Sequence, residues 1–469
     1  MILSNARLGD RIVDLRIIDG QIAEIGPELG AGIDLGGRWI LPGLWDQHVH
    51  MSQWAMFRQR FDVSGAASAS QAAAIVAAQP TPRNGAVLVG VGYRDGLWPD
   101  APTRDVIDAA VADTPVVLIS GDLHSCWLNS AALMRFGHGG RLDAVLREDD
   151  CFAVVGALDD VPEDQLDDWV RDAGQAAAAR GVVGFVDLEM TWSFDHWLRR
   201  IAAGFDTQRV RAGVYPQFLD RAIAENLHTG DRLADLLEVG PFKIITDGSL
   251  NTRTAYCVDP YPGMGNYRGM LTVEPAELRD WLRRATVAGL TAAVHAIGDE
   301  ANSLALDAYE TLGITGRIEH AQLLCEGDVA RFHQLGIAAS VQPEHAMDDR
   351  DVADIYWAGR TGRSFVLAAL SAAGVQLLMG SDAPVAPLDP WVTIAAAVWR
   401  ARGREPWHPE QRISTALALD SSVQSRIAVG ERADLVVVDL DPLVATEDQL
   451  RGMPVAATLL GGRFTHRVL

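Results

Sequence analysis

The feature that most constrains the fold of this chain is a regular alternation of short apolar runs with longer stretches of helical pattern. Eight apolar runs follow one another: WILPGLWDQH, VVGFVDL, VRAGVY, FKIIT, TAAVH, GRIEH, GIAASVQ and VQLLMGSD. Amphipathic segments such as EDQLDDWVRDAGQAAAAR and EPAELRDWLRRATVAG fill the gaps. Strands that alternate with helices build parallel sheets, and eight such units close into a barrel. The pattern therefore predicts an α/β fold, a (β/α)8 TIM-type barrel over residues 39–428.

The two ends of the chain have a different pattern. Residues 1–38 and 429–469 alternate apolar and polar residues around glycine turns, which is typical of short strands. We expect both ends to form one small composite β-sandwich. Residues from about 51 to 170 exceed one strand–helix unit and contain the further strand candidates VLVGVGY and PVVLISG. They are predicted to be an insertion after the first barrel strand.

Charge and cysteine content limit the partners and the compartment. The 40 Lys and Arg residues against 62 Asp and Glu give a net charge of −22, which argues against nucleic acid or an anionic membrane as the main partner. The N-terminal segment lacks the apolar core of a signal peptide, and the four cysteines form no CxxC pair. We therefore expect a reducing, cytoplasmic setting and a small-molecule substrate.

Histidine and aspartate side chains follow several of the predicted strands. His48 and His50 end the first run, and residues two apart on an extended strand point to the same side. His295 ends TAAVH, His320 ends GRIEH, and Asp382 follows VQLLMGS. The carboxyl ends of barrel strands build the active site, and imidazoles and carboxylates are zinc ligands. Each residue alone has an ordinary structural explanation, but together the five predict a metal site.

Lys243 is the only lysine of the chain, so 39 of the 40 basic residues are arginines (40 − 1). It lies within the apolar run FKIIT. Burial lowers the pKa of a lysine and yields a neutral amine, which can add carbon dioxide and become an anionic carbamate. Arginine cannot replace it, because the guanidinium stays protonated. We therefore predict a carboxylated Lys243 that bridges two metal ions.

Several segments carry a resemblance to a known family. PGLWDQHVH, FKIITDGSL, VHAIGD, RIEHAQLL, SVQPEH and GSDAPV resemble motifs of the amidohydrolase superfamily, in the family's order. HSCWLNSAAL is similar to a motif of its amidohydrolase-3 branch, which includes enzymes like N-substituted formamide deformylase, and ADLVVVD is similar to the family's β-sandwich segment. The resemblance implies a metal-dependent hydrolase that cleaves a C–N bond of an N-formyl, N-acyl or cyclic amide with a metal-activated hydroxide.

The resemblance also implies a role for each ligand. His48 and His50, with Asp382, would bind the more buried of two Zn²⁺ ions. His295 and His320 would bind the more exposed ion, and carboxylated Lys243 would bridge the pair. Other divalent metals could replace zinc. Asp382 would also be the catalytic proton shuttle.

Further residues are predicted to act on the substrate. His124 is expected to be a second catalytic residue that orients the substrate or the oxyanion, and Arg317 is expected to be structural. A homodimer is expected by analogy alone. The substrate-binding candidates are Trp127, Asn129, Arg253 and His345.

Two alternatives stay open at this point. A mononuclear, deaminase-like hydrolase could use His48, His50, His295 and Asp382, although such a site needs no bridging carbamate. A non-catalytic metal-binding protein on the same fold is the second alternative. Loss of ligand residues would be its signature, and no ligand position is lost in this sequence.

Overall fold

The chain folds into two compact units in the computed structural model. The structure describes residues 1–469 except 81–85, 94, 96–97, 122–124 and 148. The first unit comprises Met1–Trp54 and Val170–Leu469. The second unit comprises Ala55–Trp169.

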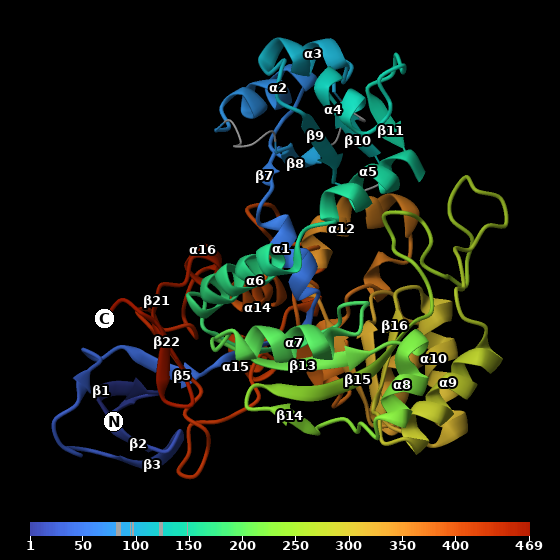
Figure 1. The fold of residues 1–469 in the computed structure, drawn as a ribbon. Coiled ribbons are helices and arrows are strands. Elements are labelled where there is room, and N and C mark those ends of the chain that lie inside the picture. Colours follow the sequence, from blue (N-terminus) through green and yellow to red (C-terminus); the bar gives the residue numbers. More distant parts are fainter. Residues whose placement is uncertain (81–85, 94, 96–97, 122–124, 148) are drawn as a thin grey trace. The chain divides into compact units, whose positions relative to one another are not determined.

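A barrel of eight parallel strands forms the centre of the first unit (Figure 1). The order of the strands in the sheet is their order in the chain, and each corresponds to one predicted run, so the barrel prediction is confirmed. The sheet nearly closes, because the N–H of Asp382 after the last strand donates to the carbonyl of His48 in the first strand at 2.8 Å. The strands are β6 (Leu44–Val49), β12 (Val182–Asp187), β13 (Arg209–Val214), β15 (Leu237–Ile245), β16 (Ala292–Ala296), β17 (Gly316–His320), β18 (Ile337–Val341) and β19 (Leu377–Met379).

Helices follow the barrel strands and bury one apolar face each. In α6, Val170, Ala173 and Ala177 recur at helical spacing, and all three are buried. A short strand, β14 (Arg232–Ala234), pairs antiparallel with β15. Helix α6 (Glu163–Ala178) belongs to this unit from Val170 onward. The other helices of this unit are α7 (Ser193–Ala202), α8 (Leu219–Ala224), α9 (Pro275–Val287), α10 (Asp299–Leu312), α11 (Asp328–Gln334), α12 (Pro343–Tyr356), α13 (Leu367–Ala372), α14 (Pro390–Trp399), α15 (Thr415–Asp420) and α16 (Glu447–Arg451).

Strands from both ends of the chain form one further sheet in the first unit. The ends meet where β20 pairs antiparallel with β5, with Val437 opposite Ile40. Alternate residues such as Leu15 and Leu459 are fully buried and form a separate apolar core. The strands, in sheet order, are β22 (Arg463–Arg467), β21 (Val455–Leu460), β20 (Leu435–Val438), β5 (Trp39–Pro42), β1 (Ile2–Leu8), β2 (Arg11–Ile18) and β3 (Gln21–Gly26), with β4 (Ile33–Asp34) beside β1.

The second unit has its own sheet and its own core. The two strand candidates within the predicted insertion correspond to its strands β8 and β9, which are parallel neighbours. Helix α1 (Met51–Phe57) leads from the first barrel strand into this unit. The strands are β7 (Phe61–Asp62), β8 (Leu88–Tyr93), β9 (Val116–Ser120), β10 (Ser125–Leu128) and β11 (Val145–Arg147), and the helices are α2 (Ala69–Ala77), α3 (Arg104–Ala110), α4 (Ser130–Arg135) and α5 (Asp149–Asp159).

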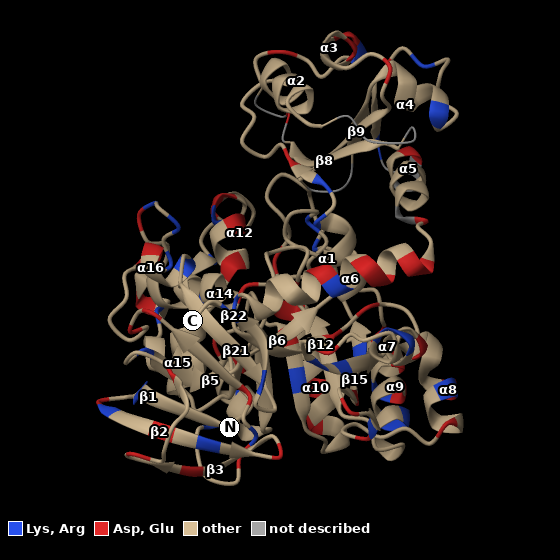
Figure 2. Ribbon diagram, turned by 60° about the vertical axis from the view of Figure 1, so that its left-hand side comes forward, with Lys and Arg blue, Asp and Glu red and all other residues tan. Residues whose placement is uncertain are grey.

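The charges of the chain are distributed over both units. Acidic residues, in red, occur on many helices and strands of the ribbon, with basic residues, in blue, between them (Figure 2). The net charge of −22 is therefore not concentrated on one element. Among the described residues, the helices are too short or too polar to cross a membrane.

Candidate metal centre

The first barrel strand supplies three polar side chains to the candidate centre. Asp46 and His48 lie in β6, and His50 directly follows its last residue. His48 is 1% exposed, whereas the side chain of His50 is 14% exposed. The strand therefore leads from a closed interior at His48 to a more accessible position at His50.

Lys243 lies in β15 and reaches the first of these histidines. Its Nζ atom lies 3.4 Å from His48 Nε2, and the residue is 2% exposed. Burial lowers the pKa of Lys243 to about 8, although the negative charges of Glu319 and Asp382 oppose this shift. The neutral amine is therefore far more populated near neutral pH than in an exposed lysine.

Asp382 enters the centre from the turn after β19. Its φ of +58° is in the left-handed region, so the chain turns sharply at this residue. The Asp46 carboxylate accepts hydrogen bonds from the N–H of Ser381, at 2.9 and 3.1 Å, and from the N–H of His48, at 3.1 Å. A side chain at Gly380 would place its Cβ 2.7 Å from the nitrogen of His48. Asp46 and Gly380 together hold the turn against β6.

His295 and His320 come from the ends of β16 and β17. His320 has a φ of +74°, which breaks the alternation of the strand and redirects its ring. The centroid of this ring lies 4.4 Å from that of His295 and 5.0 Å from that of His48. Burial, reinforced by His295, lowers the pKa of His320 well below its usual value. His320 is therefore a neutral imidazole, the form that binds metals.

The donor set fits a divalent cation. Ligand atoms of His48, His320 and Asp382 lie within 4.8 Å of one another. Asp382 Oδ1 lies 3.3 Å from His48 Nε2 and 3.4 Å from His50 Nε2, so one carboxylate oxygen faces two imidazoles. Within the described part of the chain, the buried Nδ1 atoms of His50 and His320 have no hydrogen-bond partner. Imidazoles and carboxylates are ligands that zinc prefers. The structure brings all six predicted ligands into this one region.

Comparison with known proteins identifies the family. A profile of the amidohydrolase family matches residues 31–466 of this 469-residue chain. The chain belongs to the amidohydrolase family. The resemblance to the amidohydrolase superfamily, and to its amidohydrolase-3 branch, is thereby confirmed.

Curated relatives of this amidohydrolase match it along nearly its whole length. Protein LONG AFTER FAR-RED 3 of Arabidopsis thaliana is 28% identical over 95% of this chain and 85% of that protein. Putative amidohydrolase YtcJ of Bacillus subtilis is 26% identical to this chain, and the match covers 98% of this chain and 96% of that protein. N-substituted formamide deformylase of Arthrobacter pascens is 25% identical to this chain, and the match covers 94% of this chain and 93% of that protein.

A solved structure has the same fold as this amidohydrolase. An uncharacterised metal-dependent hydrolase from Pyrococcus horikoshii OT3 superposes with a TM-score of 0.80 at 24% identity, covering 95% of this chain and 99% of that chain. This likeness concerns the fold. Family membership and the ligand cluster together support a metal-dependent hydrolase.

The centre also contains buried charges that no motif had singled out. Glu319 Oε2 lies 2.8 Å from His48 Nδ1, and Arg317 Nε lies 2.5 Å from Glu319 Oε1. Asp247 Oδ1 lies 3.4 Å from His295 Nε2. A signal was available in β17, because Arg317 and Glu319 stand two residues apart, on either side of Ile318, in a five-residue strand that ends at His320. Arg317, expected to be structural, thus contacts a partner of a predicted ligand.

Of the predicted substrate contacts, His345 lies at the centre. Its Nε2 atom is 3.8 Å from Asp382 Oδ2, and its ring stacks on His320 at a centroid distance of 6.2 Å. The guanidinium of Arg253 lies 5.4 Å from the ring centroid of Tyr356. Tyr356 belongs to helix α12, which also carries His345. Substrate binding by His345 and Arg253 stays a prediction.

The remaining predicted contacts belong to the second unit. Trp127 is 0% exposed in its core and donates its indole N–H to the carbonyl of Thr103 at 3.1 Å. Asn129, also 0% exposed, accepts hydrogen bonds from the N–H groups of Val116 and Ala132 at 2.9 Å. Both residues therefore have structural roles in this unit, and their part in substrate binding stays a prediction. His124 lies outside the described residues.

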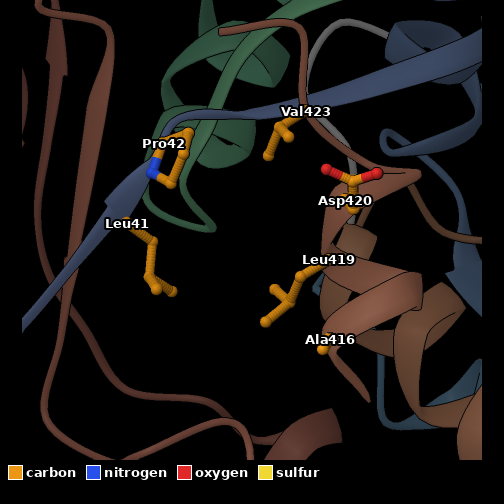
Figure 3. Close-up of a pocket in the computed structure, with 6 residues that line it drawn as sticks. All are labelled: Leu41, Pro42, Ala416, Leu419, Asp420 and Val423. Atoms are coloured by element: carbon orange, nitrogen blue, oxygen red, sulfur yellow. The ribbon is translucent and has the colours of Figure 1, made fainter. Parts of the chain in front are cut away.

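The first unit also contains a pocket that differs from the candidate metal centre in its position and in its mostly apolar lining. It lies between β5 and α15, and Asp420 supplies its single carboxylate (Figure 3). None of the six predicted metal ligands lines it, so we assign it no part in the chemistry. The lining residues are Leu41, Pro42, Ala416, Leu419, Asp420 and Val423.

Proposed function

We propose that this amidohydrolase cleaves a C–N bond of an N-formyl, N-acyl or cyclic amide, with two Zn²⁺ ions bridged by carboxylated Lys243. The observation that carries the proposal is the placement of the only lysine, which is 2% exposed with its Nζ atom 3.4 Å from His48 Nε2. The name of one relative, N-substituted formamide deformylase, supports an amide substrate. The chain covers 93% of that relative.

The carbamate forms from the neutral amine and carbon dioxide. The Nζ lone pair bonds to the carbon of CO₂ as one C=O π bond opens, and the nitrogen releases one proton to water, so that the side chain gains a negative charge and two oxygens. The lowered pKa of Lys243, about 8 because of burial, favours this reaction by raising the share of free amine. The new anion would also neutralise part of the charge of two divalent ions.

Asp382 is the proposed proton shuttle. Divalent ions held by the six ligands would supply Lewis-acid polarisation of the substrate carbonyl and a lowered pKa for water. Burial would raise the pKa of Asp382, but the neighbouring His48 and His50 hold it well below its usual value, so the carboxylate is ionised. It can accept a proton from the attacking water and deliver it to the leaving nitrogen.

His345 is the proposed substrate-orienting residue. Its Nε2 atom is buried, faces Asp382 Oδ2 at 3.8 Å, and lacks a hydrogen-bond partner among the described residues. Gln322 Nε2 lies 3.3 Å from its other ring nitrogen and fixes the ring plane. A polar group of the substrate, bound beside Asp382, would satisfy this nitrogen.

A panel of amides tests the proposal. The zinc-loaded protein is assayed on N-formyl, N-acyl and cyclic amides, with zinc counted by elemental analysis and the carbamate carbon sought by ¹³C NMR after growth in labelled bicarbonate. We expect hydrolysis of at least one class, about two Zn²⁺ per chain and a carbamate resonance that Lys243→Arg lacks. A full complement of zinc without a carbamate signal would contradict the bridge.

A single-ion site is the second candidate. It is favoured by the compactness of His48, His320 and Asp382, whose ligand atoms lie within 4.8 Å of one another. Such a site would bind about one Zn²⁺ per chain and would keep its metal in Lys243→Arg. Zinc stoichiometry of the wild type and of this variant therefore separates the two candidates.

A further inference from the structure

We propose that Glu319, supported by Arg317, is a positioning residue that fixes which ring nitrogen of His48 is free to bind an ion. The inference deepens the proposed function and rests on it. None of the motifs that led to the ligand set includes a role for either residue. The argument depends on the hydrogen-bonding chemistry of the two nitrogens of one buried imidazole.

The first nitrogen faces a carboxylate. His48 Nδ1 lies 2.8 Å from Glu319 Oε2, and the two residues are 1% and 0% exposed. The other carboxylate oxygen, Oε1, lies 2.5 Å from Arg317 Nε, so that the carboxyl group is paired with a guanidinium. An ionised carboxylate can accept a hydrogen bond but cannot donate one. The proton of a neutral His48 must therefore be on Nδ1.

The second nitrogen faces the predicted ligands. When Nδ1 of a neutral His48 carries the proton, the lone pair of the ring is on Nε2. Lys243 Nζ, a donor, lies 3.4 Å from Nε2, in agreement with this tautomer. Asp382 Oδ1, an acceptor, lies 3.3 Å from the same atom. Two lone pairs facing each other repel, and a cation between them would remove this repulsion.

Arg317 supplies the positive charge that faces Glu319. Its Nε atom lies 2.5 Å from Glu319 Oε1, and its Nη2 group donates to the carbonyl of Gln47 at 3.3 Å. The residue before His48 is thus tied to the strand that carries Glu319. Arg317 and Glu319 alternate on β17 and share one side of it, so one strand presents both charges.

The imidazoles of His50 and His320 lack such a partner on their Nδ1 atoms. The Nδ1 atoms of His50 and His320 are buried and make no hydrogen bond to any residue that the structure describes. Orientation by a carboxylate partner is thus seen at His48 in particular. Partners of this kind change metal affinity by about 10- to 100-fold in known sites.

Two variants test the role of Glu319. Glu319→Gln removes the charge and lets the amide donate to Nδ1, which would move the imidazole proton to Nε2. The double variant Arg317→Met/Glu319→Leu removes both charges and leaves neither unpaired, so the core is expected to fold. Zinc affinity is measured by competition with a chromophoric chelator. We expect both variants to bind zinc about 10- to 100-fold more weakly than the wild type.

A matched control separates positioning from general stability. Asp434 is also buried, at 1% exposure, and also pairs with an arginine, Arg209, at 2.8 Å. Asp434→Asn is expected to keep wild-type zinc affinity. The inference would be overturned if both Glu319 variants bound zinc within about threefold of the wild type, or if the control lost as much affinity as they do.

A second readout does not depend on zinc. In the metal-free protein labelled with ¹⁵N-histidine, His48, assigned with His48→Gln, should show a protonated Nδ1 and an unprotonated Nε2. Protonation at Nε2 would overturn the inference. If the wild type has the expected tautomer but binds no zinc, the proposed function fails while the positioning stands. If zinc binds and the tautomer is wrong, the positioning alone fails.

Discussion

The inner and outer parts of the candidate metal centre differ in how their ligands are held. His48 and Lys243 are 1% and 2% exposed, and a buried ion pair lies against His48. The side chains of His50 and His295 are each 14% exposed. The inner part is therefore arranged by charges that are inaccessible to solvent, while the outer part is more exposed to solvent. The ligand types are similar, and the difference lies in the residues behind them.

The largest effect is expected when the amine of Lys243, in the inner part, is removed. Lys243→Arg keeps a positive charge but cannot form a carbamate, so we expect turnover to fall by about 10³-fold or more and zinc to drop below two per chain. Steady-state rates and elemental analysis measure both effects. Near-normal turnover with two zinc ions bound would show that the inner part needs no bridge.

The second largest effect is expected at Asp382, whose carboxylate lies between the inner and outer parts. Asp382→Asn keeps an oxygen ligand but cannot accept the proton of the attacking water, so zinc should be retained while turnover falls by about 10²- to 10⁴-fold. Metal content and the pH dependence of the rate are the measurements. A rate that is unchanged over the whole pH range would exclude Asp382 as the proton shuttle.

A pair of histidine variants compares the inner and outer parts directly. His48→Gln removes an oriented inner ligand, whereas His295→Gln removes a ligand at the more open side. We expect the first to weaken zinc binding about tenfold more than the second, because the orienting contact of Glu319 is lost with it. Equal losses in a chelator competition would mean that burial and orientation add nothing to affinity.

The smallest effect is expected beside the outer part. Glu189 accepts hydrogen bonds from the N–H groups of Ser52 and Gln53, at 3.2 and 3.3 Å, in the first turn of α1. Glu189→Gln removes a negative charge from a helix N-terminus, so the free energy of unfolding should fall by about 0.3–1 kcal/mol. Urea denaturation measures this change. Zinc affinity should stay at the wild-type value, and a clear drop would make Glu189 part of the centre.

The barrel could be predicted because its signal is local and repeated. Each strand is a short apolar run bounded by helical pattern, and the ligands stand at the carboxyl ends of those runs. His48 and His50 needed no more than the alternation of an extended strand to point to the same side. Lys243 was conspicuous as the one lysine in the sequence.

The residues that contact the ligands, such as Glu319, could not be predicted from local sequence patterns. Glu319 and His48 are 271 residues apart, and their contact depends on the register and stagger of the barrel strands. His320 turns into the centre through a φ of +74°, which the apolar pattern of its strand does not indicate. In the second unit, sequence proximity suggested substrate contacts for Trp127 and Asn129, whereas the structure uses their polar groups to hold their own unit together.

Because Lys243 is buried, chemical labelling of its amine can report unfolding of this protein. The sequence contains a single side-chain amine, and it is 2% exposed. An amine-selective reagent applied to the folded protein would leave this side chain unmodified, and its modification would report opening of the barrel. Counting attached labels by mass spectrometry would thus follow unfolding at one defined atom, without any engineered probe.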